Sequence, residues 1–121
     1  MPPKKTLVLG ASSNPARYSF LAVNKLREHS HPVIAIGKKK GSIADVSIEL
    51  KASPISDLDT VTLYLNRDNQ KNYYDFIIAQ HPNRVIFNPG AENPEFEKML
   101  EAKGIKAIEA CTLVLLGTGQ F

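Results

Sequence analysis

The feature of this sequence that most constrains its fold is a regular alternation of short apolar runs with longer stretches of helical character. The apolar runs predict five buried strands, at residues 5–9, 33–36, 61–65, 85–87 and 105–110. The apolar spacing between them predicts helices at about 15–28, 69–79 and 94–103. Strands and helices in this order are typical of an α/β protein with a parallel sheet.

In such an alternation the crossovers are right-handed and the helices cover both faces of the sheet. We therefore predict a Rossmann-like α/β fold, with a parallel five-stranded sheet in a single domain over residues 1–121. Residues 42–56 are less regular, and the alternation of Val46, Ile48 and Leu50 with polar residues suggests a short edge strand. The conformation of the tail, 112–121, stays open.

Two helix starts have the same pattern of asparagine followed by proline. Asn14-Pro15 and Asn93-Pro94 each place an N-cap residue before a proline at the first helical position. The second start also has acidic residues in its first turn, where the helix dipole favours them. We expect helices to begin at both places.

The composition excludes several classes of protein. The one cysteine, Cys111, cannot form an internal disulfide, so we exclude a secreted disulfide scaffold and expect a cytoplasmic location. The apolar run near the start is too short for a signal peptide, and no run reaches the ~20 apolar residues of a spanning helix. We therefore expect no membrane partner. Since His29, His31 and His81 lack metal-ligand spacing with Cys111, we expect no metal site.

Positive charge is concentrated in the first half of the chain. The net charge is +3, but residues 1–51 hold nine Lys and Arg against three Asp and Glu, whereas residues 52–121 hold six against nine. This excess indicates an anionic partner, although an uneven solvated surface would give the same counts. We expect no nucleic acid, because +3 is small and the lysines lack interleaved aromatics.

Ligands of parallel sheets bind beyond the carboxyl ends of the strands. The turn after the first strand, Gly10-Ala11-Ser12-Ser13-Asn14, has small residues that let the backbone approach a ligand, and it leads to a helix N-terminus that can bind phosphate. It keeps only Gly10 of the pattern G-x-G-x-x-G and is not a Walker loop. A phosphate site and a plain tight turn both stay open.

Lys38-Lys39-Lys40 follow the second strand, where NAD-binding folds normally have an acidic residue for the ribose. Lysines favour a phosphate on the adenosine ribose instead, either the 2′-phosphate of NADP or the 3′-phosphate of coenzyme A. The alternative is a solvated basic loop. Arg17-Tyr18-Ser19 and Asn66-Arg67 would add further cations to the same edge of the sheet.

The residues Leu7-Val8-Leu9-Gly10-Ala11-Ser12, Asn14-Pro15 and Arg17-Tyr18-Ser19 resemble the opening of the stand-alone CoA-binding domain proteins. These are similar to the N-terminal CoA-binding domain of the succinyl-CoA synthetase alpha chain. The resemblance covers nearly the whole chain and continues through Val33-Ile34-Ala35-Ile36 with its lysines, Asn66-Arg67, Phe87-Asn88-Pro89-Gly90 and Ile108-Glu109-Ala110-Cys111.

The resemblance implies that coenzyme A is the ligand. By this resemblance the turn after the first strand would meet the diphosphate and ribose, the lysines would lie near the phosphates, and the later loops would flank the adenine and pantetheine. The implied binding residues are Gly10, Ala11, Ser12, Ser13, Asn14, Arg17, Tyr18, Ser19, Lys38, Lys39, Lys40, Asn66, Arg67, Asn88, Pro89 and Gly90. The chain departs from the family pattern at Ile36-Gly37-Lys38 and over 41–56.

We therefore expect a cytoplasmic CoA or acyl-CoA binding protein, with an NADP-type dinucleotide-binding domain of a reductase as the alternative. Succinyl-CoA synthetase needs a phosphohistidine from a further domain, and this chain ends at Phe121, so we expect no ligase activity. Cys111 is the one strong nucleophile, but a lone cysteine is more often a core residue, and we assign no catalytic residue. The apolar stretch 113–116 could cover the sheet edge or contact a partner, and the sequence leaves open whether the chain forms a homodimer.

Overall fold

A computed structural model describes residues 2–121, and its centre is one mostly parallel sheet. The strands lie in the order β3-β4-β2-β1-β5-β6-β7, and only the pair β3–β4 is antiparallel. They are β1 (Thr6–Ala11), β2 (Val33–Gly37), β3 (Gly41–Ile43), β4 (Val46–Glu49), β5 (Thr60–Leu63), β6 (Arg84–Phe87) and β7 (Lys106–Glu109). The predicted α/β class and parallel sheet are confirmed.

The predicted number of five strands is wrong, because the sheet has seven. The two additional strands, β3 and β4, form a hairpin at the sheet edge, and Ala44 in its turn has a φ of 53°. The second of them overlaps the edge strand suggested by the sequence. Ile43 is the only large apolar residue of β3, so the sequence has no apolar alternation that would predict this strand. The side chain of Ile43 is 1% exposed because it packs against other elements.

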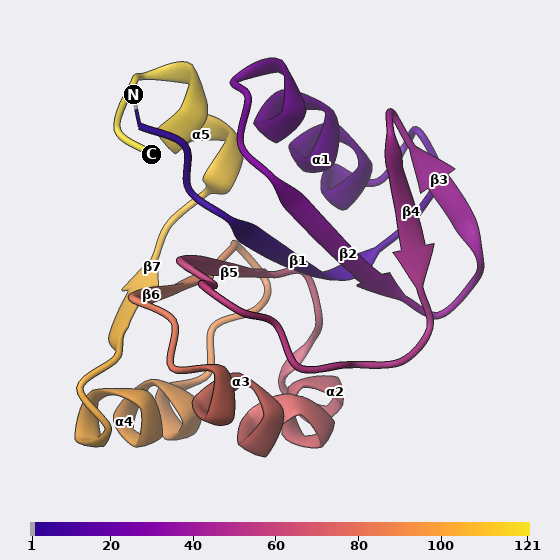
Figure 1. Cartoon of the computed structure of the whole chain (residues 1–121). Helices are drawn as coiled ribbons and strands as arrows, with labels where there is room; N and C mark the ends of the chain where they lie inside the picture. Colours follow the sequence, from indigo (N-terminus) through magenta and orange to yellow (C-terminus); the bar gives the residue numbers. More distant parts are fainter. Residues whose placement is uncertain (1) are drawn as a thin grey trace.

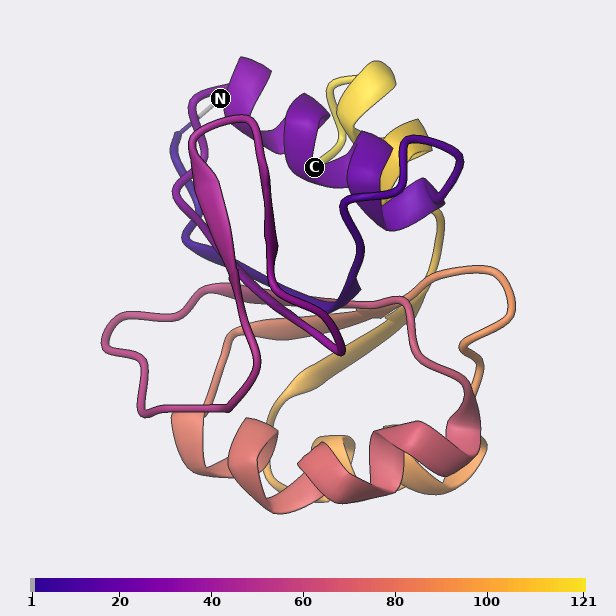
Figure 2. The same cartoon turned by 90° about the vertical axis from the view of Figure 1, so that its right-hand side faces the viewer.

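The helices cover both faces of the sheet. They are α1 (Tyr18–Glu28), α2 (Arg67–Gln70), α3 (Tyr74–Gln80), α4 (Pro94–Ala102) and α5 (Thr112–Gly117), with a 3₁₀ turn, η1 (Lys71–Tyr73), between α2 and α3. Figures 1 and 2 show α1 and α5 on one face and α2, α3 and α4 on the other. None of the helices within residues 2–121 combines the length and apolarity needed to cross a membrane.

The central strand β1 is buried on both faces. Leu7 and Leu9 pack in the cluster that also contains Phe96 of α4, whereas Val8 packs in the cluster that contains Leu26 of α1. Because successive side chains of a strand point to opposite faces, the apolar run of β1 supplies both cores. This burial holds the carboxyl end of β1 at the middle of the sheet.

The predicted helix start at Pro15 is wrong, since α1 begins at Tyr18. Asn14 caps a separate turn: its Oδ1 accepts from the Ala16 N–H at 3.0 Å, and its carbonyl accepts from the Arg17 N–H at 3.0 Å. The predicted start at Asn93 is confirmed, because Asn93 Oδ1 accepts from the Phe96 N–H at 3.2 Å.

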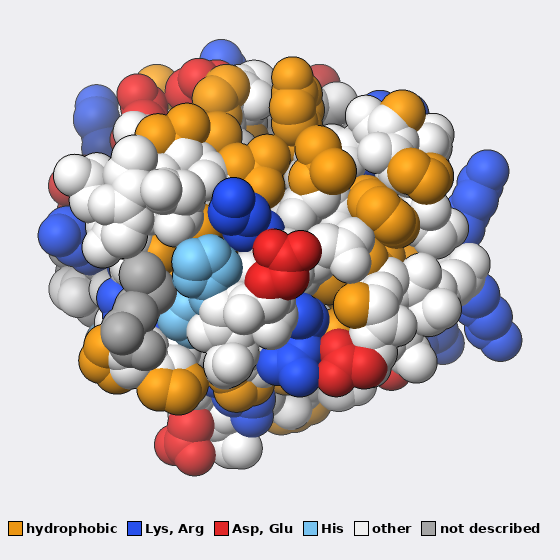
Figure 3. Space-filling model, turned by 90° about the horizontal axis from the view of Figure 1, so that it is seen from above, with side chains coloured by type: hydrophobic (Ala, Val, Ile, Leu, Met, Phe, Trp, Pro, Cys, Tyr) orange, Lys and Arg blue, Asp and Glu red, His pale blue; other side chains and the backbone are white. Residues whose placement is uncertain are grey.

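The tail forms α5, which lies beside α1 on one face of the sheet (Figure 1). Leu116 is 1% exposed and belongs to the core, whereas Val114 is 58% exposed. Figure 3 shows this face, on which hydrophobic side chains are spread between charged ones. The apolar tail therefore packs on a face of the sheet beside α1, whereas the sequence suggested that it covers the sheet edge or contacts a partner.

Candidate functional site

A cavity of about 690 Å³ lies at the carboxyl ends of β1, β2, β5 and β6. We call it the carboxyl-edge cavity. The chain leaves β1 for β2 on one side and returns on the other side as β5, so the cavity opens at the switch point of the sheet. Its lining consists of Gly10, Ala11, Ser12, Ser13, Asn14, Arg17, Tyr18, Ser19, Lys38, Lys39, Tyr64, Leu65, Asn66, Asn69, Pro89, Gly90 and Ala91.

Most of the sequence-predicted site residues therefore lie together. Of the predicted set, only Lys40, Arg67 and Asn88 are outside the lining. Sequence reasoning missed Tyr64, Leu65, Asn69 and Ala91. Tyr64 and Leu65 fell inside the predicted strand 61–65, whereas β5 ends at Leu63, so the sequence did not show that they lie at a strand end.

The first turn (Gly10–Asn14) approaches β5 closely. Gly10 has a φ of 90°, and a Cβ there would lie 2.7 Å from the Tyr64 carbonyl oxygen, so only glycine fits. The Ser12 Oγ accepts from the Asn14 N–H at 3.1 Å and shapes the turn. A Cβ on Gly41 would lie 3.0 Å from Ser13 Oγ, so the turn also borders the start of β3.

The cations on the cavity have no carboxylate partner. Within residues 2–121 the only ion pair joins Arg27 to Asp45, neither of which lines this cavity. Arg17 is the exposed N-cap of α1, and the first turn of that helix has no acidic residue. By contrast, α4 has two glutamates in its first turn. The α1 terminus therefore remains positive and open to an anion.

The opposite wall comes from the loops after β5 and β6. Asn66 is the N-cap of α2, and its Oδ1 accepts from the Asn69 N–H at 2.9 Å. Arg67 follows as an exposed residue outside the lining. Pro89 and Gly90 are exposed on the second loop. This wall offers amide groups and apolar surface rather than charge.

Asn88 lies beneath the cavity, and its side chain forms hydrogen bonds in the protein interior. It is 2% exposed, and its Nδ2 donates to Thr62 Oγ1 at 2.6 Å and to the Leu63 carbonyl at 2.9 Å. Its Oδ1 accepts from the Thr112 N–H at 2.8 Å. These bonds join the ends of β5, β6 and α5 below the cavity.

Tyr64 bridges the cavity and this buried layer. Its hydroxyl is buried without a well-formed hydrogen bond, beside the Thr62 and Thr112 hydroxyls, which bond to each other at 2.7 Å. Burial raises the pKa of Tyr64 to about 12, so the phenol is neutral at physiological pH. Within the described part of the chain no cluster of His, Cys, Asp or Glu could hold a metal ion.

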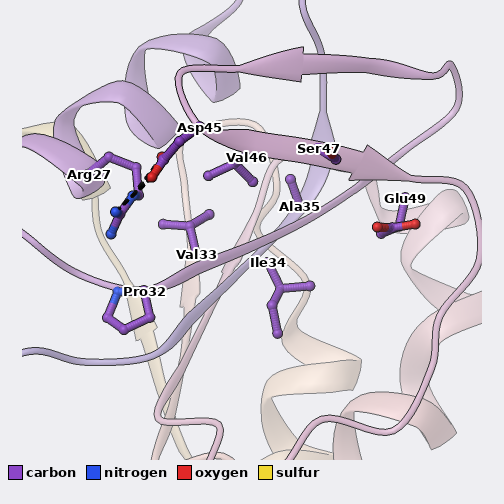
Figure 4. Close-up of a pocket in the computed structure, with 9 residues that line it drawn as sticks. All are labelled: Arg27, Pro32, Val33, Ile34, Ala35, Asp45, Val46, Ser47 and Glu49. Carbon is purple, nitrogen blue, oxygen red and sulfur yellow. Dashed lines mark hydrogen bonds and ion pairs between the residues drawn. The ribbon is translucent and has the colours of Figure 1, made fainter.

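A second cavity of about 540 Å³ lies where β2 and β4 diverge (Figure 4). We call it the β2–β4 cavity. Its cation is already engaged: Arg27 Nε and Nη2 donate to the Asp45 carboxylate at 2.9 Å each, and Nη1 donates to the His31 carbonyl at 2.8 Å. The Arg27 hydrogen bonds lower the pKa of the Asp45 carboxyl. An anionic ligand would find no free cation there.

A family model described as the CoA binding domain matches residues 4–117, which include every residue of the carboxyl-edge cavity. The chain belongs to the CoA-binding domain family. The resemblance to CoA-binding domain proteins found in the sequence is thereby confirmed.

Solved structures have the same fold as this CoA-binding domain. An uncharacterized protein known from a crystal structure is 45% identical, with 100% of each chain covered and a TM-score of 0.97. A Thermus thermophilus protein is 22% identical over 98% of this chain and 91% of its own, with a TM-score of 0.81. A hypothetical protein of Pyrococcus horikoshii is 22% identical over 93% and 80%, with a TM-score of 0.82. No protein with a curated description matches significantly.

Proposed function

We propose that this CoA-binding domain binds coenzyme A or an acyl-CoA in the carboxyl-edge cavity. The observation that carries the proposal is the set of unpaired cations on that cavity, Arg17, Lys38 and Lys39, in a chain whose family is defined by CoA binding. Coenzyme A carries a diphosphate and a ribose 3′-phosphate, so it needs cations and free N–H groups at two places. The cavity offers cations at two places, the N-terminus of α1 and the loop after β2.

The first turn and the α1 N-terminus would hold the diphosphate. Gly10 and Ala11 lack bulky side chains, so phosphate oxygens can approach the backbone N–H groups. Arg17 and the positive end of α1 would stabilise the negative charge. Ser12, Ser13 and Ser19 line the same region and can donate hydroxyl hydrogen bonds.

The lysine loop (Lys38–Lys40) would bind the ribose 3′-phosphate. Lys38 and Lys39 line the cavity, and Lys40 is exposed next to them. Ammonium groups form strong charge-assisted hydrogen bonds to phosphate. In this proposal the loop selects coenzyme A against NAD, whose adenosine ribose carries no 2′- or 3′-phosphate.

The loops after β5 and β6 would contact the adenine and pantetheine. Leu65, Pro89 and Ala91 offer apolar surface, and Asn66 offers an amide. Arg67, exposed beside Asn66, would reach a phosphate only from outside the cavity. Asn88 would act indirectly, by holding these loops from below.

We propose binding without catalysis, in the cytoplasm. Cys111 is a free thiol and is half-buried at the N-cap of α5, outside the cavity lining. A single unpaired cysteine fits a reducing compartment. The family match supports a CoA ligand, and no residue of the cavity is assigned a catalytic role.

Calorimetric titration with CoA, dephospho-CoA, NADP and NAD tests the proposal. We expect CoA to bind most tightly and dephospho-CoA, which lacks the 3′-phosphate, to bind more weakly. Equal binding of these two would contradict the assignment of the lysine loop. Binding of NADP alone would overturn coenzyme A as the ligand and favour the dinucleotide-binding alternative.

A further inference from the structure

Gln70 is the last residue of α2, and its side chain is fully buried. Both the nitrogen and the oxygen of its amide form hydrogen bonds within the protein. Its Nε2 donates to the Leu65 carbonyl at 2.9 Å and to the Ala91 carbonyl at 2.7 Å. Its Oε1 accepts from Asn93 Nδ2 at 3.0 Å. One amide therefore connects α2 to both the loop after β5 and the loop after β6.

The two carbonyls belong to the loops that form one wall of the carboxyl-edge cavity. Leu65 follows β5 and Ala91 follows β6, and both residues line the cavity, whereas Gln70 does not. The bonds therefore connect the two loops from behind the wall. Because each N–H of an amide points in a fixed direction, the separation of these loops is fixed as well.

The orientation of the Gln70 amide is imposed by its neighbours. Asn93 Nδ2 also donates to the Tyr74 hydroxyl at 2.7 Å, and Asn93 Oδ1 caps α4, so the Asn93 amide has one arrangement. Tyr74 in turn donates to Glu95 Oε2 at 3.1 Å. With an Asn93 N–H against its oxygen, Gln70 must direct its own NH₂ group at the two carbonyls.

We propose that Gln70 is a positioning residue that sets the width of the carboxyl-edge cavity, and thereby the affinity for its ligand. This inference rests on the proposed function for the identity of the ligand. The side chain at this position must donate two hydrogen bonds and accept one from the same terminal group, and only an amide does this. A glutamate there would place carboxylate oxygens against two carbonyl oxygens, and an apolar side chain would leave all three partners unpaired.

The test compares Gln70→Met with the matched control Gln80→Met. Gln80 also bridges two segments, since its Oε1 accepts from the Ile55 N–H at 2.8 Å and its Nε2 donates to the Phe76 carbonyl at 3.2 Å. It lies outside the carboxyl-edge cavity. Two measurements are made on both variants: amide hydrogen exchange without ligand, and calorimetric titration with CoA.

We expect Gln70→Met to speed exchange at residues 65–66 and 90–91 and to weaken CoA binding by roughly tenfold or more, because a loosened wall no longer presents its groups in register. Gln80→Met should leave both properties of the cavity unchanged. If Gln70→Met does not fold, Gln70→Asn replaces it, since this variant keeps the amide but is one methylene too short for both carbonyls.

Unchanged exchange at 65–66 and 90–91 in a folded Gln70 variant would overturn the proposal. An equal loss of CoA affinity in Gln80→Met would also overturn it, because the effect would then be a general loss of stability. If the wild-type protein does not bind CoA, the proposed function fails, and the exchange measurement alone decides whether Gln70 positions the wall.

Discussion

The molecule has two cavities of similar volume along β2, and they differ in the state of their charged groups. The carboxyl-edge cavity, about 690 Å³, has Lys38 and Lys39 without carboxylate partners. The β2–β4 cavity, about 540 Å³, has Arg27 bound to both oxygens of Asp45. Volume alone would not tell which one is a binding site.

The difference follows from how each cavity arises. The carboxyl-edge cavity forms where parallel strands end together, so free N–H groups and loop side chains point into one space. The β2–β4 cavity forms because these strands pair only at Ala35–Ile48 and Ile36–Glu49 and then separate. Arg27 lines that gap and joins α1 to the β3–β4 turn. One cavity offers free groups to a ligand, whereas the other uses its groups for the fold.

The largest effect is expected for Gly10→Ala in the first turn. The new Cβ would lie 2.7 Å from the Tyr64 carbonyl oxygen, at a backbone with a φ of 90°. The contact and the strain together should lower the free energy of unfolding by about 3 kcal/mol or more, as urea denaturation would measure. CoA affinity should be lost with the shape of the turn.

Gly104→Ala is the control for this substitution. Gly104 also has a positive φ, 76°, but a Cβ there would meet nothing within 4 Å. It should cost only the backbone strain, about 1–2 kcal/mol. Equal losses in the two variants would show that the close approach of β1 to β5 does not constrain the carboxyl-edge cavity.

The next largest effect is expected when Lys38, Lys39 and Lys40 are all replaced by alanine. Loss of charge-assisted bonds to a phosphate should weaken CoA binding by about 1–3 kcal/mol, measured by calorimetry. Binding of dephospho-CoA should change little. A loss of affinity for CoA but not for dephospho-CoA would assign the ribose 3′-phosphate to the lysine loop.

Replacement of Lys98, Lys103 and Lys106 by alanine is the matched control. These three side chains are exposed and lie outside the carboxyl-edge cavity, yet their removal changes the net charge by the same amount. The control should keep wild-type affinity for CoA. A loss as large as that of the lysine-loop variant would mean that net charge, and not a local contact, governs binding.

A smaller effect concerns pH and His31, whose carbonyl binds Arg27 beside the β2–β4 cavity. The ring is fully buried, and its Nδ1 accepts from the Lys4 N–H at 2.9 Å. Burial lowers the pKa of His31, and the positive groups of His29, Lys4 and Arg84 lower it further. As the pH falls below about 6.5, the unfolded chain takes up the proton first, so the free energy of unfolding should decrease.

Urea denaturation at several pH values between about 7.5 and 5.5 measures this dependence. His31→Asn retains an acceptor near the position of Nδ1 but does not titrate, so its stability should change less with pH than that of the wild type. His81→Asn, at an exposed position, should keep the wild-type dependence. Equal losses of stability on acidification in the His31 and His81 variants would contradict the predicted role of His31.

The smallest effect is expected for Asp45→Asn in the β2–β4 cavity. The ion pair with Arg27 is exposed, with side-chain exposures of 31% and 65%, so its loss should change stability little. CoA affinity, measured by calorimetry, should equal that of the wild type. Reduced affinity would mean that the ligand contacts the β2–β4 cavity or depends on it. It would contradict the view that only the carboxyl-edge cavity binds the ligand.

Much of the fold could be predicted because its elements have local signals. The runs that became β1 and β6 are apolar and short, and Asn93-Pro94 carries its own cap. The hairpin of β3 and β4 was harder, because Gly41 and Ser42 give β3 no apolar pattern. The start of α1 was misplaced because Asn14 bonds to a nearby turn that imitates a helix cap.

The candidate site was predictable to the extent that it follows strand ends. Small residues after β1 and lysines after β2 can be read directly, and both groups line one cavity. Tyr64 and Ala91 were missed because nothing in their residue types distinguishes them from core residues. Gln70 was missed because its partners, the Leu65 and Ala91 carbonyls, are backbone atoms that leave no mark on the sequence.

The α/β class, the buried central strand and the family can be inferred without the structure, since they depend on apolar periodicity and on residues that lie close together along the chain. Only the tertiary structure decided which cations stay free. Arg27 and Asp45 are 18 residues apart, and the fold brings them together, whereas it brings no carboxylate to Lys38. Charge can be counted along the chain, but its partners depend on distances that exist only after folding.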